Sequence, residues 1–180
     1  FSIGQFTQIP DYYFESELIS MGLDSWPVDG KILTSSVDTV TYLYLSRPYI
    51  NDLTGIEDFV NLESIIISNI DVTTANFRHN IKLEYLEWNY HQLTSLDVSY
   101  NTSLKVLEFH PLTFNLHPNA NLFNSIDLTN CLNLESLKCS YNYLDSLDLS
   151  NNLMLKELDC SYNQIEHIQF GQNTQLSSIN

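Results

Sequence analysis

Apolar and polar positions recur along this chain with a period of 21 residues. Counted from the first leucine of a unit, apolar side chains stand at offsets 0, 3 and 5 and again at 10, 13 and 15, with asparagine at offsets 8 and 18. The clearest unit starts at Leu134 and recurs at Leu155, and the same pattern runs backwards to Leu83 and Leu62. Self-similarity at such a period is the signature of stacked repeats.

Some units depart from this pattern. The first, from Val40, has 22 residues, and the unit from Leu104 has 30, so that it carries nine extra residues within Thr113–Ser125. A partial unit starts at Leu176. Four positions where the pattern has asparagine carry another residue: Ile70, His91, Leu112 and Cys131.

The spacing within a unit predicts strands and not a helix. Apolar residues at offsets 0, 3 and 5 do not follow the period of 3.6 of an amphipathic helix, whereas the pairs at offsets 3 and 5, and 13 and 15, alternate as strands do. One unit cannot bury its own apolar face, so neighbouring units must stack. We therefore expect about six stacked turns with a parallel sheet, and asparagine amides that point inward and bond backbone groups of successive turns.

The N-terminal segment lacks the repeat and predicts a helical cap. A helix is expected over residues 10–22, with Pro10 and Asp11 at its start and Gly22 as its stop. Its apolar side chains would cover the open end of the first turn, as a solenoid requires. This divides the chain into a cap at 1–39 and an array at 40–180. No C-terminal cap is visible, so we expect the chain to continue in the intact protein or its end to pair with something.

Particular stretches resemble a known family. The units LKCSYNYLDSLDLSNN and LDCSYNQIEHIQFGQN fit the pattern LxxLxLxxNxL of leucine-rich repeats, and they resemble the cysteine-bearing repeats of internalin J-like bacterial surface proteins. INDLTGIEDFVNLESIIIS resembles the first turn of internalin-type arrays, and IPDYYFESELISMGLDS resembles the helical cap of related secreted proteins. The resemblance implies a leucine-rich repeat solenoid, a right-handed curved superhelix with a parallel β-sheet and an N-terminal helical cap. It is specific for fold and says little about the ligand.

Charge excludes several function classes. Seven Lys and Arg against 22 Asp and Glu give a net charge of −15 and a pI near 4.3. Nucleic-acid binding and attachment to anionic lipid both rest on clustered cations, so we expect neither, and no apolar segment is long enough for membrane insertion. The family resemblance and the absence of an initial Met at Phe1 favour a processed protein that is secreted or at the cell surface, extracellular or associated with an outer membrane.

The three cysteines do not form a metal-binding pattern. Cys139 and Cys160 stand at the same inward offset of adjacent units, and neither they nor Cys131 show CxxC or Cys/His spacing for zinc. Free, buried thiols that act as small apolar side chains are the favoured interpretation. A disulfide between Cys139 and Cys160 is the alternative, which neighbouring strand positions suit poorly.

Outward positions of the first strand in each unit form one face with tyrosines and acidic groups. Exposed Tyr beside carboxylates is typical of a recognition surface. The alternative is that the Tyr side chains stack along their own column and stabilise the sheet. We favour this alternative for Tyr141 and Tyr162, whereas binding is favoured for Tyr42, Tyr44, Tyr85 and Glu87. The candidate ligand-binding residues are Tyr42, Tyr44, Tyr85, Glu87, Tyr90, Glu108, His110, Tyr141 and Tyr162.

Three further features have two interpretations each. Glu87, Glu108 and His110 together could hold a divalent metal, but an open sheet does not exclude water, so we predict neither a metal nor a cofactor. Asp97, Asp127 and Asp148 form a column of like charge with hydroxyl residues beside it, which is explained either by hydrogen bonds or, less favourably, by a cation. The insertion within Thr113–Ser125 either packs on the outer surface or meets a partner.

These observations predict a non-enzymatic binding module. The sequence has no Ser/His/Asp spacing, P-loop or HExxH motif, so we expect no catalytic residues. The partner expected is a protein of unknown identity, with a glycan left open, that docks on the Tyr and acidic face. The alternative is a structural spacer or cap domain of a larger surface protein, with no ligand of its own.

Overall fold

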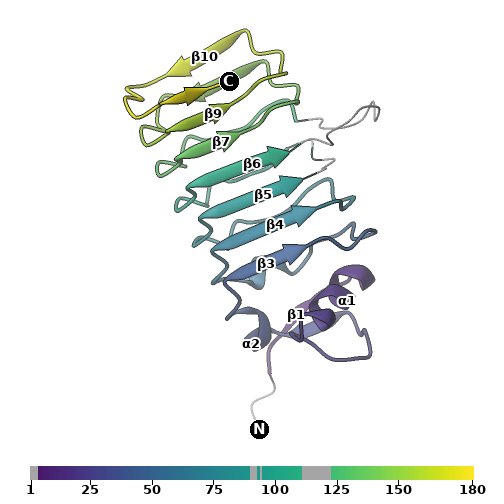
Figure 1. The fold of residues 1–180 in the computed structure, drawn as a ribbon. Coiled ribbons are helices and arrows are strands. Elements are labelled where there is room, and N and C mark those ends of the chain that lie inside the picture. Colours follow the sequence, from purple (N-terminus) through teal and green to yellow (C-terminus); the bar gives the residue numbers. More distant parts are fainter. Residues whose placement is uncertain (1–3, 90–92, 94, 111–122) are drawn as a thin grey trace.

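The chain folds as a solenoid built on one parallel sheet (Figure 1). The computed structural model describes residues 4–89, 93, 95–110 and 123–180. Its seven strands lie in the order β11-β9-β7-β6-β5-β4-β3, which apart from β11 is one strand per full turn. Their bounds are Tyr42–Leu45 for β3, Ser64–Ser68 for β4, Tyr85–Asn89 for β5, Val106–His110 for β6, Ser136–Lys138 for β7, Glu157–Asp159 for β9 and Ser178–Ile179 for β11.

The strand register confirms the repeat alignment. Leu43 pairs with Ile65, Ile65 with Leu86, and Leu86 with Leu107, so each strand lies one repeat unit from the next. The 30-residue unit keeps the register as well, since Leu107 pairs with Leu137 on β7. All of these side chains are buried in one continuous core. The nine extra residues therefore leave the sheet unshifted. The predicted solenoid of about six turns is confirmed.

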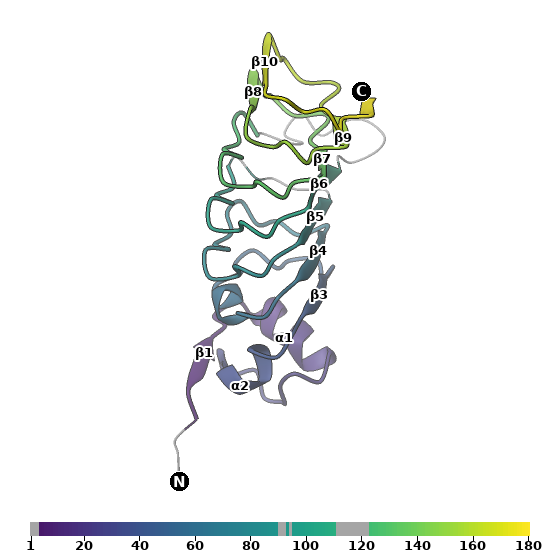
Figure 2. The same ribbon diagram turned by 90° about the vertical axis from the view of Figure 1, so that its left-hand side faces the viewer.

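The opposite side of each turn is less regular than the spacing predicts. Strand alternation at offsets 13 and 15 predicts a strand there in every unit, but in the described residues strands form only in two C-terminal turns, as β8 (Ser146–Leu149) and β10 (His167–Phe170), which pair in parallel. A single bridge joins Asn76 to Asp97 in earlier turns. Figure 2 shows this side across the solenoid from the main sheet. Its apolar residues, such as Phe77 and Val98, are nonetheless buried.

A column of inward asparagines, the asparagine ladder (Asn80, Asn101, Asn152 and Asn173), links successive turns; the first three are buried and Asn173 is half-buried. The Asn101 side-chain amide donates to the carbonyl oxygens of Phe77 at 3.0 Å and Asn80 at 2.9 Å in the preceding turn. The other three make equivalent pairs of bonds. This confirms the inward role predicted for offset 18. Cys131 interrupts the ladder, with Sγ 3.8 Å from the Val98 carbonyl oxygen.

The N-terminal segment forms a two-stranded antiparallel sheet and a helix. Strands β1 (Phe6–Gln8) and β2 (Lys31–Leu33) pair antiparallel, helix α1 (Tyr12–Ser20) lies between them in sequence, and α2 (Thr34–Val37) and the 3-10 helix η1 (Ile56–Asp58) follow. No helix in the described part of the chain is long and apolar enough to cross a membrane.

Two buried carboxylates attach α1 to its surroundings. The Asp11 carboxylate accepts bonds from the Tyr13 and Phe14 amides at the helix start and from the Asn51 and Asp52 amides of the first turn. A carboxylate in this position caps the free amides of a helix N-terminus. Because Asp11 is the cap, the helix begins at Tyr12, later than the residue 10 that the sequence suggested.

The second carboxylate belongs to Glu15. It is fully buried and accepts the Asp29 and Gly30 amides at 2.8 Å each. On the apolar side of the helix, Phe14 and Leu18 are buried, and the Phe14 ring lies 6.5 Å from that of Phe59. The helix is therefore packed against the first turn by both polar and apolar contacts.

Candidate binding face

Two columns of outward side chains form what we call the sheet face. The strand pairing places them in register as the sequence predicted. The first column is Tyr42, Ser64, Tyr85, Val106, Ser136 and Glu157; the second is Tyr44, Ile66, Glu87, Glu108, Lys138 and Asp159. Tyr42 and Tyr44 have exposed fractions of 56% and 43%, large values for aromatic side chains on a sheet.

Three outward residues of β5 form a hydrogen-bonded chain centred on a carboxylate. The Tyr85 hydroxyl donates to Glu87 Oε2 at 2.5 Å, and the Asn89 side-chain amide donates to Glu87 Oε1 at 2.7 Å. Burial and the neighbouring Glu87 carboxylate raise the pKa of Tyr85, so its hydroxyl keeps the proton that it donates. These bonds hold both the ring and the carboxylate in place along the strand.

Glu108, the register neighbour of Glu87, is paired with a base. Lys138 Nζ lies 2.8 Å from Glu108 Oε1, on the next strand of the same column. The bond to Glu108 raises the pKa of Lys138, although burial opposes the shift. The ammonium on the far side of Glu108 therefore offsets part of the repulsion between the two stacked carboxylates. The sequence placed Lys138 in this column without predicting the pair.

The metal interpretation of Glu87, Glu108 and His110 gains no support. The backbone of His110 ends β6 opposite Asn89, but its side chain lies outside the described residues. Among the residues that the structure describes, no group of three His, Cys, Asp or Glu side chains could hold a metal ion. Tyr90 and residues 111–122 of the insertion also lie outside the described residues. The described end of the insertion, Phe123, is buried with its ring 5.1 Å from that of Phe109.

Tyr141 and Tyr162 stack on one another at the strand exits, as the sequence favoured. Their ring centroids are 4.1 Å apart with an interplanar angle of 13°. The backbone is left-handed at both, with φ of 57° and 54°, and Asn69 at the equivalent position has φ of 55°. Asn adopts this conformation readily, whereas a bulky residue is strained there. Both rings remain largely exposed, at 48% and 70%.

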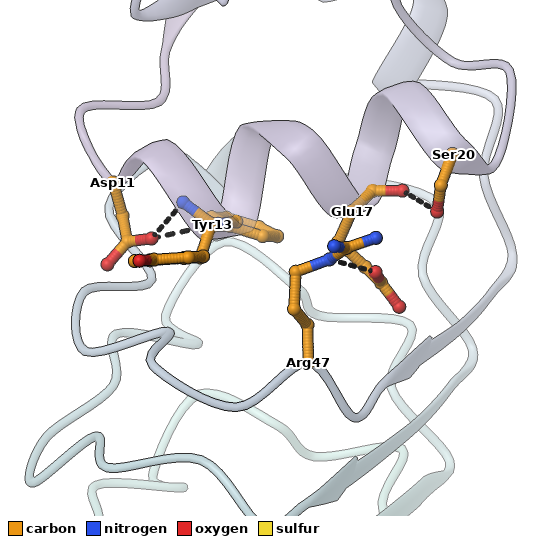
Figure 3. Close-up of polar contacts among 6 residues, drawn as sticks. Asp11, Tyr13, Glu17, Ser20 and Arg47 are labelled. Atoms are coloured by element: carbon orange, nitrogen blue, oxygen red, sulfur yellow. Dashed lines mark hydrogen bonds and ion pairs between the residues drawn. The ribbon is translucent and has the colours of Figure 1, made fainter.

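A second tyrosine cluster beside α1 was not found from the sequence. The rings of Tyr12 and Tyr13 lie 5.3 Å apart, and Tyr13 lies 5.4 Å from Tyr49. All three are exposed. On the same helix as Tyr13, Glu17 Oε2 pairs with Arg47 Nε at 2.6 Å (Figure 3). The adjacent Tyr12 and Tyr13 after the cap residue were the available signal. Their contact with Tyr49 depends on how the helix docks, which the repeat pattern does not specify.

The aspartate column on the opposite side is explained by hydrogen bonds. In Asp97, Asp127 and Asp148, Oδ1 accepts the amide of the residue two positions on at 2.9 Å. Side-chain and backbone bonds from Ser99, Thr129 and Ser150 lower the pKa of the three carboxyl groups. The hydrogen bonds that the favoured interpretation predicted are therefore present.

Every lysine and arginine side chain of the protein is engaged within the chain. Five of the seven pair with carboxylates: Lys31 with Asp29, Arg47 with Glu17, Lys105 with Glu84, Lys138 with Glu108, and Lys156 with Glu135. Of the other two, Lys82 bonds Asn61 Oδ1 and Arg78 lies over the Tyr100 ring. The columns of the sheet face hold four carboxylates, at Glu87, Glu108, Glu157 and Asp159, against one ammonium at Lys138. An approaching molecule therefore meets a net negative surface.

The cysteines are free thiols, as favoured. Cys131 and Cys139 are buried and Cys160 is half-buried. Burial, with a smaller effect of the Asp127 charge, raises the pKa of Cys131 to about 11. Burial also raises the pKa of Cys139 and of Cys160. All three thiols are therefore protonated near neutral pH and act as apolar side chains.

Comparison with solved structures finds similarity to two internalins. No protein-family model and no curated protein matches the sequence. The functional domain of InlJ from Listeria monocytogenes, which includes a cysteine ladder, is 26% identical with a TM-score of 0.46, and the match covers 97% of this chain. It covers 47% of that chain, so this protein spans about half the length of the InlJ domain.

A second internalin, InlF from Listeria monocytogenes strain 4b F2365, is 17% identical with a TM-score of 0.43, over 96% of this chain and 71% of that one. The assignment of the fold stands on the chain's own strand register and asparagine ladder. The protein is a leucine-rich repeat solenoid similar to the internalins InlJ and InlF.

Proposed function

We propose that this protein is a non-enzymatic binding module that recognises a protein partner through the sheet face, in a secreted or cell-surface setting. The observation that carries the proposal is the combination of exposed tyrosines with a net negative charge on a rigid sheet. Tyr side chains supply a large contact area at a low cost in conformational entropy. The carboxylates among them favour partners of opposite charge.

The backbone supports this role because it is already ordered. In-register strands hold Tyr42, Tyr44 and Tyr85, and hydrogen bonds fix the Glu87 carboxylate before any partner arrives. A preorganised surface loses less entropy on binding. The internalin-like fold is in keeping with an interaction module, while the alternative of a spacer domain uses the same fold with no ligand.

A comparison of two double variants tests the proposal. Tyr42→Ser with Tyr44→Ser removes two exposed rings from the sheet face. Tyr100→Ser with Tyr143→Ser removes two rings of similar exposure, 48% and 45%, away from it. Each protein is immobilised and exposed to surface-protein extracts, and the captured proteins are identified by mass spectrometry. The binding of a captured protein to the wild type and to each variant is then measured by surface plasmon resonance.

The proposal expects at least about tenfold weaker binding of the captured partner by the face variant, since exposed aromatic anchors dominate interface energies at about 2 kcal/mol or more each. The control variant should bind like the wild type, and both should melt close to it. Equal binding by the two variants contradicts the proposal and leaves the spacer role.

A further inference from the structure

The first column of the sheet face contains a gap between two tyrosines. Tyr42 and Tyr85 both pair with Ser64, one from each side, so the small serine side chain lies between two rings. Neighbouring strands are about 4.8 Å apart, so the two tyrosines stand about 9.6 Å from each other. We call this feature the Ser64 slot, with Tyr42 and Tyr85 as its walls and Ser64 as its floor.

The dimensions of the slot fit one planar cation. A group centred over β4 lies about one strand spacing, ~4.8 Å, from each strand that carries a wall, which is comparable with the ~6 Å at which a cation is attracted to an aromatic ring. Guanidinium groups stack on aromatic faces, and they are more weakly hydrated than ammonium groups. An amino-acid side chain that is both flat and charged therefore suits the slot better than a rounded one.

The charges around the slot select a cation as well. Glu87 lies next to Tyr85 along β5 and accepts the hydrogen bond of its hydroxyl. Each carboxylate oxygen of Glu87 accepts one bond, which leaves further acceptor capacity. The bases of the chain are engaged elsewhere, with Lys138 held by Glu108. The chain thus supplies the slot with a fixed negative charge.

From this geometry we infer that the Ser64 slot receives an arginine side chain from a basic segment of a partner protein. The guanidinium lies between Tyr42 and Tyr85 and donates to Glu87, in the manner of charge-assisted bonds between arginine and carboxylate. The inference rests on the proposed function and specifies the chemistry of the partner. It makes Ser64 a residue that determines specificity, because a larger side chain there closes the slot.

Model peptides test the slot directly. The probe is an N-acetylated, C-amidated nonapeptide of alternating arginine and glycine, compared with peptides in which citrulline or lysine replaces arginine. Citrulline has nearly the shape of arginine without its charge. Isothermal titration calorimetry in 50 mM and in 300 mM salt is expected to show the arginine peptide binding about tenfold or more tightly than the citrulline peptide, with lysine between them and affinity falling at the higher salt.

Two serines of the same column give a matched pair of variants. Ser64→Leu fills the slot, whereas Ser136→Leu makes the same change between Val106 and Glu157, where no aromatic walls stand. Both are half-buried outward positions, so the core is untouched. Ser64→Leu should weaken the arginine peptide about tenfold and Ser136→Leu less than twofold. Equal effects of the two variants, or equal binding of arginine and citrulline peptides, overturns the inference.

The two proposals fail in different ways. If capture of a partner is lost in the Tyr42 and Tyr44 double variant but kept in Ser64→Leu, the binding module stands and the slot is refuted. If capture depends on neither, both are refuted. A captured partner that loses binding after deglycosylation, but not after its arginines are blocked with 1,2-cyclohexanedione, would show that a glycan occupies the face in place of a basic segment.

Discussion

The asparagine ladder offers a quantitative test of how the turns are joined, because one of its positions carries cysteine. Asn101 makes two bonds to the preceding turn, of 3.0 Å and 2.9 Å, whereas Cys131 makes one long contact of 3.8 Å. Replacing Asn101 by Cys therefore gives this turn the residue that the ladder already has one turn later, at Cys131. The substitution removes a side-chain amide and adds no new charge.

The expected cost follows from the bonds that remain. Each acceptor keeps a backbone donor, since the Asn80 amide bonds the Phe77 carbonyl and the Leu83 amide bonds the Asn80 carbonyl. The loss is therefore two neutral hydrogen bonds at about 1 kcal/mol each, and not the full desolvation of a buried carbonyl. Asn101→Cys should lower the free energy of unfolding by about 2 kcal/mol, or the melting temperature by about 4–8 °C for a chain of this length.

Urea unfolding in reducing buffer, followed by far-ultraviolet circular dichroism, measures this change. Asn151→Cys is the control, because Asn151 is exposed and its amide makes only one bond, of 3.5 Å to Thr129. The control should cost less than about 0.5 kcal/mol, as other surface substitutions do. If both variants lose the same stability, the ladder amides do not join the turns in the way we argue.

Three further predictions concern the buried and the titrating groups. Glu15→Gln should lower the free energy of unfolding by about 2 kcal/mol in urea titrations, because the Asp29 and Gly30 amides bond different carboxylate oxygens and Gln replaces one of these acceptors with an NH2 donor. Glu17→Gln should cost under about 1 kcal/mol. Maleimide labelling at pH 8, followed by mass spectrometry, should modify Cys160 before Cys131 or Cys139, because Cys160 is the more accessible thiol. At a pKa of about 11, only about one part in a thousand of Cys131 is thiolate at this pH. Hydrogen bonds lower the pKa of Asp97, Asp127 and Asp148 in the folded protein. The stabilisation from these bonds is present above the ordinary carboxyl pKa and is lost as pH falls through the lower folded-state pKa. The triple Asp→Asn variant should therefore show a smaller fall in urea midpoint between pH 5 and pH 2 than the wild type.

The sequence predicted the fold because, in stacked turns, each position of the repeat has the same surroundings in every turn. Leu86 and Leu107 are both core residues, and they pair because a slip of one residue would expose every core side chain of the strand. The asparagines of the ladder were predictable in the same way, because their amides can reach only the backbone of the preceding turn. The second strand was overpredicted. Val98 is buried there without forming a strand, which shows that burial at offsets 13 and 15 does not require pairing.

The candidate site was predicted at the level of columns but not of contacts. Register fixed which residues neighbour Tyr85 and Glu108, yet the bonds to Glu87 and Lys138 depend on the rotamers that the side chains adopt. The Tyr13 and Tyr49 contact depends on the docking of α1, for which the sequence supplied only a helix and its apolar side. The division of the chain at residue 39, and the ligand-contact roles of all nine candidate residues, stay predictions.

The stacked pair of Tyr141 and Tyr162 is not explained by stability alone. A left-handed backbone at a bulky residue costs about 1–2 kcal/mol, while an aromatic stack gains about 0.5–1.5 kcal/mol beyond its buried area. Two strained residues therefore cost about 2–4 kcal/mol, and one stack leaves a net cost of about 0.5–3.5 kcal/mol. Asn69 holds the same conformation at the equivalent position without that strain. What the tyrosines add is a rigid aromatic surface, 48% and 70% exposed, on turns distant in sequence from the Ser64 slot. Strain held at an exposed position is more easily understood as a property of a contact surface than of the solenoid that carries it.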